Sequence, residues 1–93
     1  MDQQQLHDDL LRLQAELREV STLDERDREA LERLASEIEA LLEKQRHHPR
    51  ELAPEYAGLR DQLRENVAAL EASYPQLTLL MRNIIDSLAY LGI

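Results

Sequence analysis

Histidine and acidic side chains are the groups in this chain that could do chemistry, either as metal ligands or in proton transfer. The sequence contains three histidines, at positions 7, 47 and 48, and 19 acidic residues. Di-iron helical bundles place a Glu three residues before a His, and no such pair occurs in this sequence. His47 and His48 are neighbours in a predicted loop, where adjacent side chains usually diverge. We therefore expect no metal site, and whether His47 and His48 bind anything stays open.

Nucleophilic catalysis and phosphate binding have equally little support. Cysteine is absent. The serines are Ser21, Ser36, Ser73 and Ser87, and none has a histidine three or four residues away, where the two side chains would be neighbours on a helix. Glycine occurs only at Gly58 and Gly92, too sparsely for a glycine-rich phosphate loop. The sequence therefore predicts no catalytic residue and no cofactor, with an enzymatic or metal-binding bundle as a remote alternative.

Length and charge limit the number of domains and the kinds of partner that the protein can have. The chain has 93 residues and a net charge of −8, which predicts one helical domain over residues 1–93. Such a charge repels phosphate backbones and anionic membranes, so we expect neither nucleic acid nor membrane as a partner. No apolar stretch reaches the ~18 residues of a membrane span, and the acidic start is unlike a signal peptide. We expect a cytoplasmic protein of a bacterial kind.

Apolar residues recur at helical spacing in four segments, at about 2–20, 22–47, 54–72 and 75–91. In the first, leucines at 6, 10, 13 and 17 are separated by four, three and four residues, as in a coiled-coil seam. Short connections between amphipathic helices place neighbours antiparallel. The sequence predicts an all-α, antiparallel helical bundle with coiled-coil-like seams. Whether one chain or two close it stays open.

Capping signals mark the starts of two helices. Thr22 and Glu25 fit a capping box, with Thr22 as N-cap of the second helix. Ser73 and Gln76 fit another, and Pro75 suits the first turn of the last helix. In the third segment, Asn66 lies at the edge of the apolar stripe. We favour a half-exposed side chain there over a buried one that fixes register.

The last helix is the least charged part of the chain. Residues 75–93 carry only two charges, Arg82 and Asp86, which are four residues apart. They either pair within or across an interface or form the solvent face of the helix, and both interpretations stay open. Leu79 and Tyr90 lie on the side opposite the main apolar stripe. The candidate core or interface residues are Leu77, Leu79, Leu80, Met81, Ile84, Ile85, Leu88, Tyr90 and Leu91.

Residues 73–93 carry a family resemblance. The ending S-Y-P-Q-L, followed by D-S-L-A-Y-L-G-I, resembles that of short acidic bacterial proteins classified only as a domain of unknown function. These proteins end in S-H-P-x-L and D-x-L-x-x-L-G-I, and Leu6-His7-x-x-Leu10 resembles their start. This chain has Tyr74 where the pattern has His. The resemblance implies an all-helical architecture and brings no activity.

A helix with apolar residues on two sides, in a chain this short, favours an interaction protein. We expect a small helical protein without catalytic activity that forms a homodimer or higher oligomer through its C-terminal helix. The alternative is an adaptor or regulator that binds a different, unidentified protein through an apolar helical face.

Overall fold

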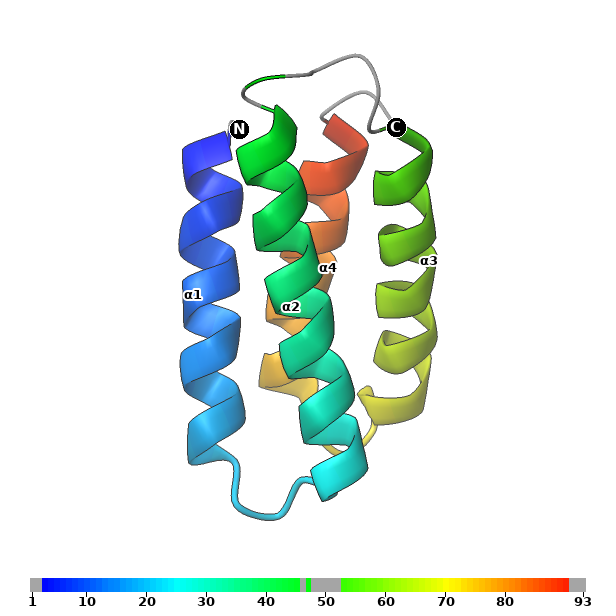
Figure 1. The fold of residues 1–93 in the computed structure, drawn as a ribbon. Helices are drawn as coiled ribbons and strands as arrows, with labels where there is room; N and C mark the ends of the chain where they lie inside the picture. The colour runs from blue at the N-terminus through cyan, green and yellow to red at the C-terminus, as the bar shows by residue number, and fades with distance from the viewer. Residues whose placement is uncertain (1–2, 46, 48–52, 91–93) are drawn as a thin grey trace.

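The computed structural model describes residues 3–45, 47 and 53–90, which contain four α-helices (Figure 1). These are α1 (Gln3–Glu19), α2 (Glu25–Gln45), α3 (Ala53–Leu70) and α4 (Pro75–Tyr90). No strand occurs in the described part of the chain, and the predicted all-α fold is confirmed. The largest shift is at the start of α2, predicted at 22 and found at 25. The predicted ends at residues 2 and 91 lie outside the described residues.

The start of α2 is set by Asp24 and not by Thr22, so the predicted cap was wrong. The Arg26 backbone N–H donates to Asp24 Oδ1 at 2.9 Å, and the Arg28 N–H donates to the Asp24 carbonyl at 2.9 Å. A carboxylate at this position satisfies a free backbone N–H and is also favoured by the positive end of the helix dipole. Asp24 therefore combines two stabilising effects, of which a threonine offers only one.

The start of α4 is also one residue later than the Ser73 cap predicts. Because the helix begins at Pro75, Tyr74 occupies the N-cap position, and its carbonyl accepts the Thr78 N–H at 3.0 Å. The N–H groups of Ser73 and Tyr74 instead donate to the Leu70 carbonyl and close α3. Pro75 lies in the first turn as predicted, where its missing N–H leaves no partner unsatisfied.

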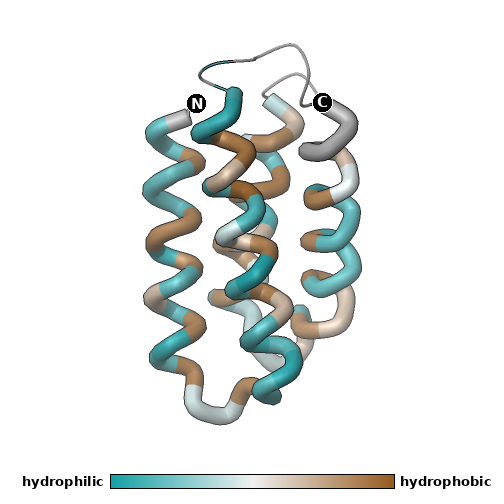
Figure 2. The backbone as a smooth tube through the Cα atoms, in the orientation of Figure 1, coloured by the Kyte–Doolittle hydropathy of each residue, from teal (hydrophilic) through white to brown (hydrophobic). Residues whose placement is uncertain are grey.

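The apolar stripes of the four helices meet in one hydrophobic cluster. Figure 2 shows apolar positions recurring along each described helix between hydrophilic ones. Buried apolar residues are Leu6, Leu10, Leu13, Leu17, Leu23, Leu31, Leu34, Ala35, Ile38, Leu41, Leu42, Leu59, Leu63, Val67, Leu70, Leu77, Met81, Ile84, Ile85 and Leu88. The burial of this apolar surface is the main favourable contribution to folding, because helices of this length are only marginally stable in isolation.

Two polar residues at the edge of the core are accommodated locally. Asp9 is buried on α1, and Gln5 Nε2 donates to both of its carboxylate oxygens, at 3.3 and 3.4 Å. Asn66 is half-buried, and its Nδ2 donates to the Gln62 carbonyl of its own helix at 2.9 Å. This bond within α3 fits the half-exposed reading of Asn66 over the register-fixing one.

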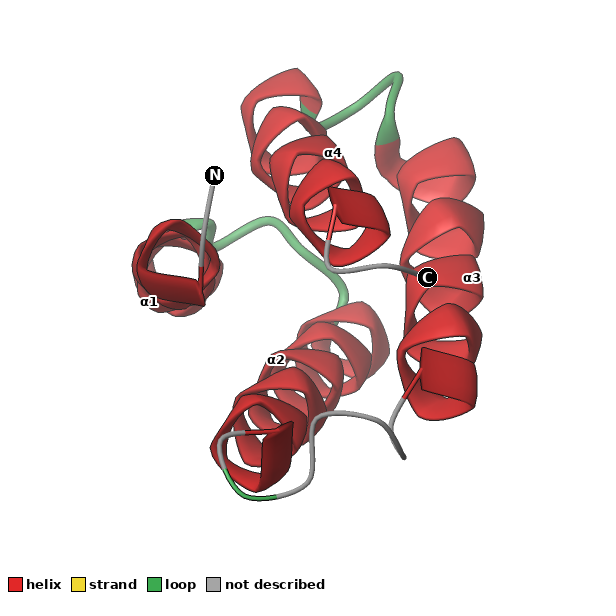
Figure 3. Ribbon diagram, turned by 90° about the horizontal axis from the view of Figure 1, so that it is seen from above, coloured by secondary structure: helices red, strands yellow, loops and turns green. Residues whose placement is uncertain are grey.

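The helices are arranged as a ring in chain order. Helices α1 and α3 each pack against α2 and α4, and the view from above shows the four around a common centre (Figure 3). The described part of one chain therefore brings all four helices together, which answers the question the sequence left open. In this arrangement each helix turns one face inward and leaves the opposite face outside.

Candidate interaction surface on the last helix

The inner face of α4 belongs to the core. Leu77, Met81, Ile84 and Leu88 are at most 2% exposed, and Ile85 is also buried. Leu80 is only half-buried, because it lies on the flank of α4, between the face toward the core and the face toward solvent. Thr78 is buried too, and its hydroxyl donates to the Pro75 carbonyl at 3.0 Å. The buried residues among these position α4 and are closed to a partner.

The outer face of α4 presents two large apolar side chains. Leu79 is 58% exposed and Tyr90 is 69% exposed. Tyr90 follows Leu79 by eleven positions, which brings it back to nearly the same side of the helix, within about 20°. The face that they share with Arg82, Asn83 and Asp86 is called the α4 outer face below. Leu91, the remaining residue predicted for this region, lies outside the described residues.

Charged groups separate the two apolar side chains of the α4 outer face. Arg82 forms an ion pair with Glu71, which lies in the turn between α3 and α4. Both side chains are about half exposed, so the pair is open to solvent. Arg82 is therefore paired across the corner of the bundle with Glu71, whereas the sequence left open whether Arg82 and Asp86 pair at an interface or face solvent. Asp86 and Asn83 are exposed beside it.

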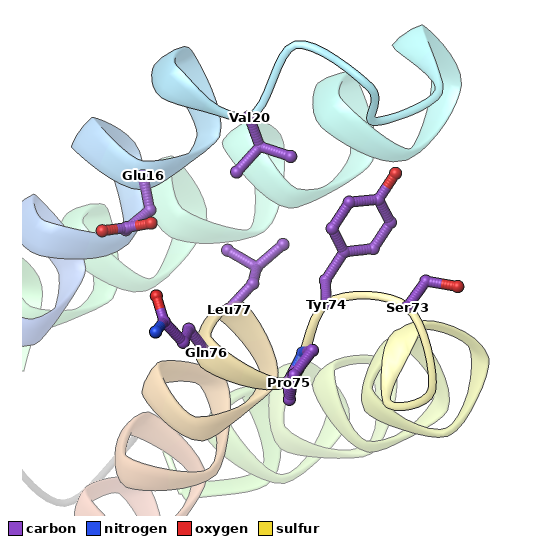
Figure 4. A pocket seen from close by; sticks show the side chains of 7 residues that line it. All are labelled: Glu16, Val20, Ser73, Tyr74, Pro75, Gln76 and Leu77. Atoms are coloured by element: carbon purple, nitrogen blue, oxygen red, sulfur yellow. The ribbon is translucent and has the colours of Figure 1, made fainter.

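A pocket lies at the end of the bundle where α1 stops and α4 begins (Figure 4). It has a volume of ≈ 270 Å³ and is lined by Glu16, Val20, Ser73, Tyr74, Pro75, Gln76 and Leu77. Val20 and Leu77 point toward each other in this view, and the Tyr74 ring stands beside them with its hydroxyl toward the α1–α2 turn. The pocket is thus apolar inside, with Glu16 and Gln76 on one side of it.

Tyr74 also joins the two turns at this end of the molecule. Its hydroxyl donates to Thr22 Oγ1 at 3.2 Å, across 52 residues of sequence. Its ring is half-buried and packs against the core beside Val20. A tyrosine at this position therefore acts as a structural tie between the α1–α2 and α3–α4 connections.

The histidine with a described polar contact is on α1. His7 Nδ1 lies 3.0 Å from Glu39 Oε1 on α2, and the two side chains are 44% and 28% exposed. A contact this open to solvent holds two helices together weakly. Among the described residues, no three His, Cys, Asp or Glu side chains are grouped so that they could hold a metal ion. His48 lies outside that part of the chain.

A comparison of the sequence with models of known protein families gives one match. The family model for a domain of unknown function, DUF4404, matches residues 6–93. The chain belongs to this family. Searches among curated proteins and among solved structures found no match.

The DUF4404 match covers nearly all of α1 and the whole of α2, α3 and α4. The α4 outer face and the Tyr74 pocket therefore both lie within the DUF4404 domain. Since the family is described by no activity, function has to be argued from these two surfaces. In the described part of this DUF4404 chain, none of the helices combines the length and apolarity needed to cross a bilayer.

Proposed function

We propose that the chain is a helical interaction protein without catalytic activity, which self-associates through the α4 outer face. The observation that carries this proposal is the pair of exposed apolar side chains, Leu79 and Tyr90, on one side of one helix. The two side chains lie about 16 Å apart along α4 with charged residues between them, so they would act as two separate apolar anchors and not as one continuous patch. Tyrosine loses little conformational entropy on binding, because only two side-chain torsions are fixed, and it is enriched among the residues that contribute most to binding.

The distribution of charge supports the choice of α4. Two copies of a protein with a net charge of −8 repel each other at most orientations. The outer face of α4 carries one cation and one anion, Arg82 and Asp86, so its own charges cancel. Two copies can therefore approach through α4 at a lower electrostatic cost than through faces on which acidic residues predominate.

The expected complex is weak, because one helix face per copy buries a small area. Interfaces below about 1,200 Å² are typical of transient encounters. Association should therefore depend on concentration over the micromolar range. Folding of each chain should not depend on it, since the core is already closed by the four helices of one chain.

Substitution of Leu79 tests the proposal. Leu79→Asp should weaken self-association at least about tenfold, because it places a charge where two apolar side chains would meet. Leu11→Asp is the matched control: Leu11 is also an exposed leucine, at 49%, but it lies on α1. Light scattering after size exclusion at high micromolar concentration gives the mass of each variant. A wild-type mass equal to that of one chain under these conditions would refute the proposal.

The Tyr74 pocket favours a second candidate, an adaptor that binds a different protein. Its ≈ 270 Å³ volume and apolar interior suit one large apolar side chain from a partner. Gln76 is exposed at this pocket, so Gln76→Trp should block it without disturbing the core. A protein captured from native lysate by the wild-type chain and lost with Gln76→Trp would support the adaptor. Recovery of the bait alone would count against it.

A further inference from the structure

We infer that α4 meets the α4 of a second copy in an antiparallel, two-fold arrangement centred near Ile84. In this arrangement Leu79 contacts the partner's Tyr90, and Arg82 pairs with the partner's Asp86. The inference rests on the proposed self-association and adds to it the orientation and register of the two helices. Each contact occurs twice, since a two-fold axis repeats every pair.

The positions of the four side chains along α4 give the register. In an antiparallel two-fold pair, two residues meet when they are equally far from the axis on opposite sides of it. The midpoint between Leu79 and Tyr90 falls between residues 84 and 85, and the midpoint between Arg82 and Asp86 falls at residue 84. These midpoints differ by half a residue, or about 0.75 Å along the helix. One axis therefore satisfies the apolar and the charged contacts together.

The angular positions of the same residues agree with this axis. Leu79 and Tyr90 lie within about 20° of each other around the helix, and both face directly outward. Arg82 and Asp86 lie to one side of Leu79, by about 60° and 20°. A two-fold axis perpendicular to the plane of the two helices keeps residues on the same side together. Arg82 therefore meets the partner's Asp86 beside the apolar contacts.

Charge complementarity selects the antiparallel orientation. In a parallel two-fold pair of α4 helices the axis runs along the helices, so Arg82 and the partner's Arg82 stand at the same height but on opposite sides of the contact. Asp86 is placed in the same way, so the parallel pair forms no contact between opposite charges. The antiparallel pair brings each Arg82 beside the partner's Asp86 and gains two such contacts, so the α4 outer face is complementary to a reversed copy of itself.

The ion pair between Arg82 and Glu71 is compatible with this second contact. It uses Nη2 of the guanidinium, which has five N–H donors in all. The pair is about half exposed, so a second carboxylate can approach from the solvent side. Glu71 also restricts the Arg82 side chain before the partner arrives, which lowers the entropy lost on binding.

Charge reversal tests the register. Arg82→Asp and Asp86→Arg should each raise the dissociation constant of the self-complex about tenfold, and the double variant should restore it to near the wild-type value. Asp86→Arg is the sharper of the two, because it makes the net charge of −8 less negative and leaves the Arg82–Glu71 pair intact. If general repulsion controlled association, Asp86→Arg would tighten it. Sedimentation equilibrium of the full chain gives these constants, and circular dichroism checks that each variant is folded.

Cysteine cross-linking tests the orientation independently, since the chain has no cysteine of its own. Asn83 and Gln76 are both exposed and lie outside the four contacts. In the antiparallel pair the two Asn83 positions are about 4 Å apart along the helices, whereas the two Gln76 positions are about 25 Å apart. A short bismaleimide should therefore link Asn83→Cys into a dimer and leave Gln76→Cys unlinked. Efficient linkage of both variants would indicate a parallel pair and overturn the inference.

The outcomes separate this inference from the proposed function. A wild-type chain that stays monomeric at high micromolar concentration refutes both. A chain that associates, is weakened by Leu79→Asp and is not weakened by Asp86→Arg retains the proposed function and refutes the register. Weakening by each single charge reversal and recovery in the double variant supports both.

Discussion

Tyr74 shows how one side chain connects distant parts of this small protein. Its hydroxyl bonds to Thr22 Oγ1 at 3.2 Å, and so joins the turns at the same end of the bundle. Tyr74→Phe should lower the free energy of unfolding by up to about 1 kcal/mol, because an exposed hydrogen bond contributes little beyond its bonds to water. Urea denaturation measures this loss. Thr22→Val should lower the free energy of unfolding no further when Tyr74→Phe is already present, because the hydrogen bond is already lost. If the losses from the two substitutions were additive, the two side chains would not interact.

Ile84 marks the point where α4 faces the centre of the core, and it is 0% exposed. Ile84→Val should cost about 0.5–1.5 kcal/mol, because it removes one buried methylene group and leaves a small void. Ile84→Asp should prevent folding, since a buried charge without a partner costs several kcal/mol.

Leu80, one turn away and half-buried, provides the comparison for Ile84. Its aspartate side chain can reach solvent, so Leu80→Asp should be the milder change. Thermal unfolding followed by circular dichroism ranks the three variants. An Ile84→Asp chain as stable as Leu80→Asp would contradict the described orientation of α4.

At the scale of the helices, Asp24 caps the N-terminus of α2 and fixes where the helix begins. Asp24→Ala should lower the free energy of unfolding by about 1 kcal/mol, because the Arg26 N–H loses its acceptor and the helix dipole loses a favourable charge. Thr22→Ala should cost less, since it removes only an exposed side-chain hydrogen bond. Equilibrium urea denaturation of the two variants decides between the caps. A larger loss for Thr22→Ala would restore Thr22 as the N-cap.

The helices themselves could be predicted because their signals are local. Leucines at 6, 10, 13 and 17 follow the helical period, and Pro75 marks the start of α4. The choice between Thr22 and Asp24 as cap could not be predicted as readily, because both residue types are good caps only two positions apart. Which one acts depends on where the turn directs the chain, and in this fold the Thr22 hydroxyl meets Tyr74 instead.

For the molecule as a whole, the candidate surface was only partly visible in the sequence. Helical geometry separates Leu79 and Tyr90 from the inward stripe of α4, and the structure leaves both exposed. The ion pair of Arg82 with Glu71 was missed, since it depends on how α3 and α4 meet at their corner. The Tyr74 pocket was missed for the same reason, since its walls come from the end of α1, from the α3–α4 connection and from the first turn of α4.

The measurement that most directly tests self-association through α4 is sedimentation equilibrium of the wild-type chain from low to high micromolar concentration. The account predicts an average mass that rises with concentration from the 10.8 kDa of one chain toward twice that value. The same rise should be absent for Leu79→Asp and preserved for Leu11→Asp. A wild-type mass that stays at 10.8 kDa over the whole range would contradict the account.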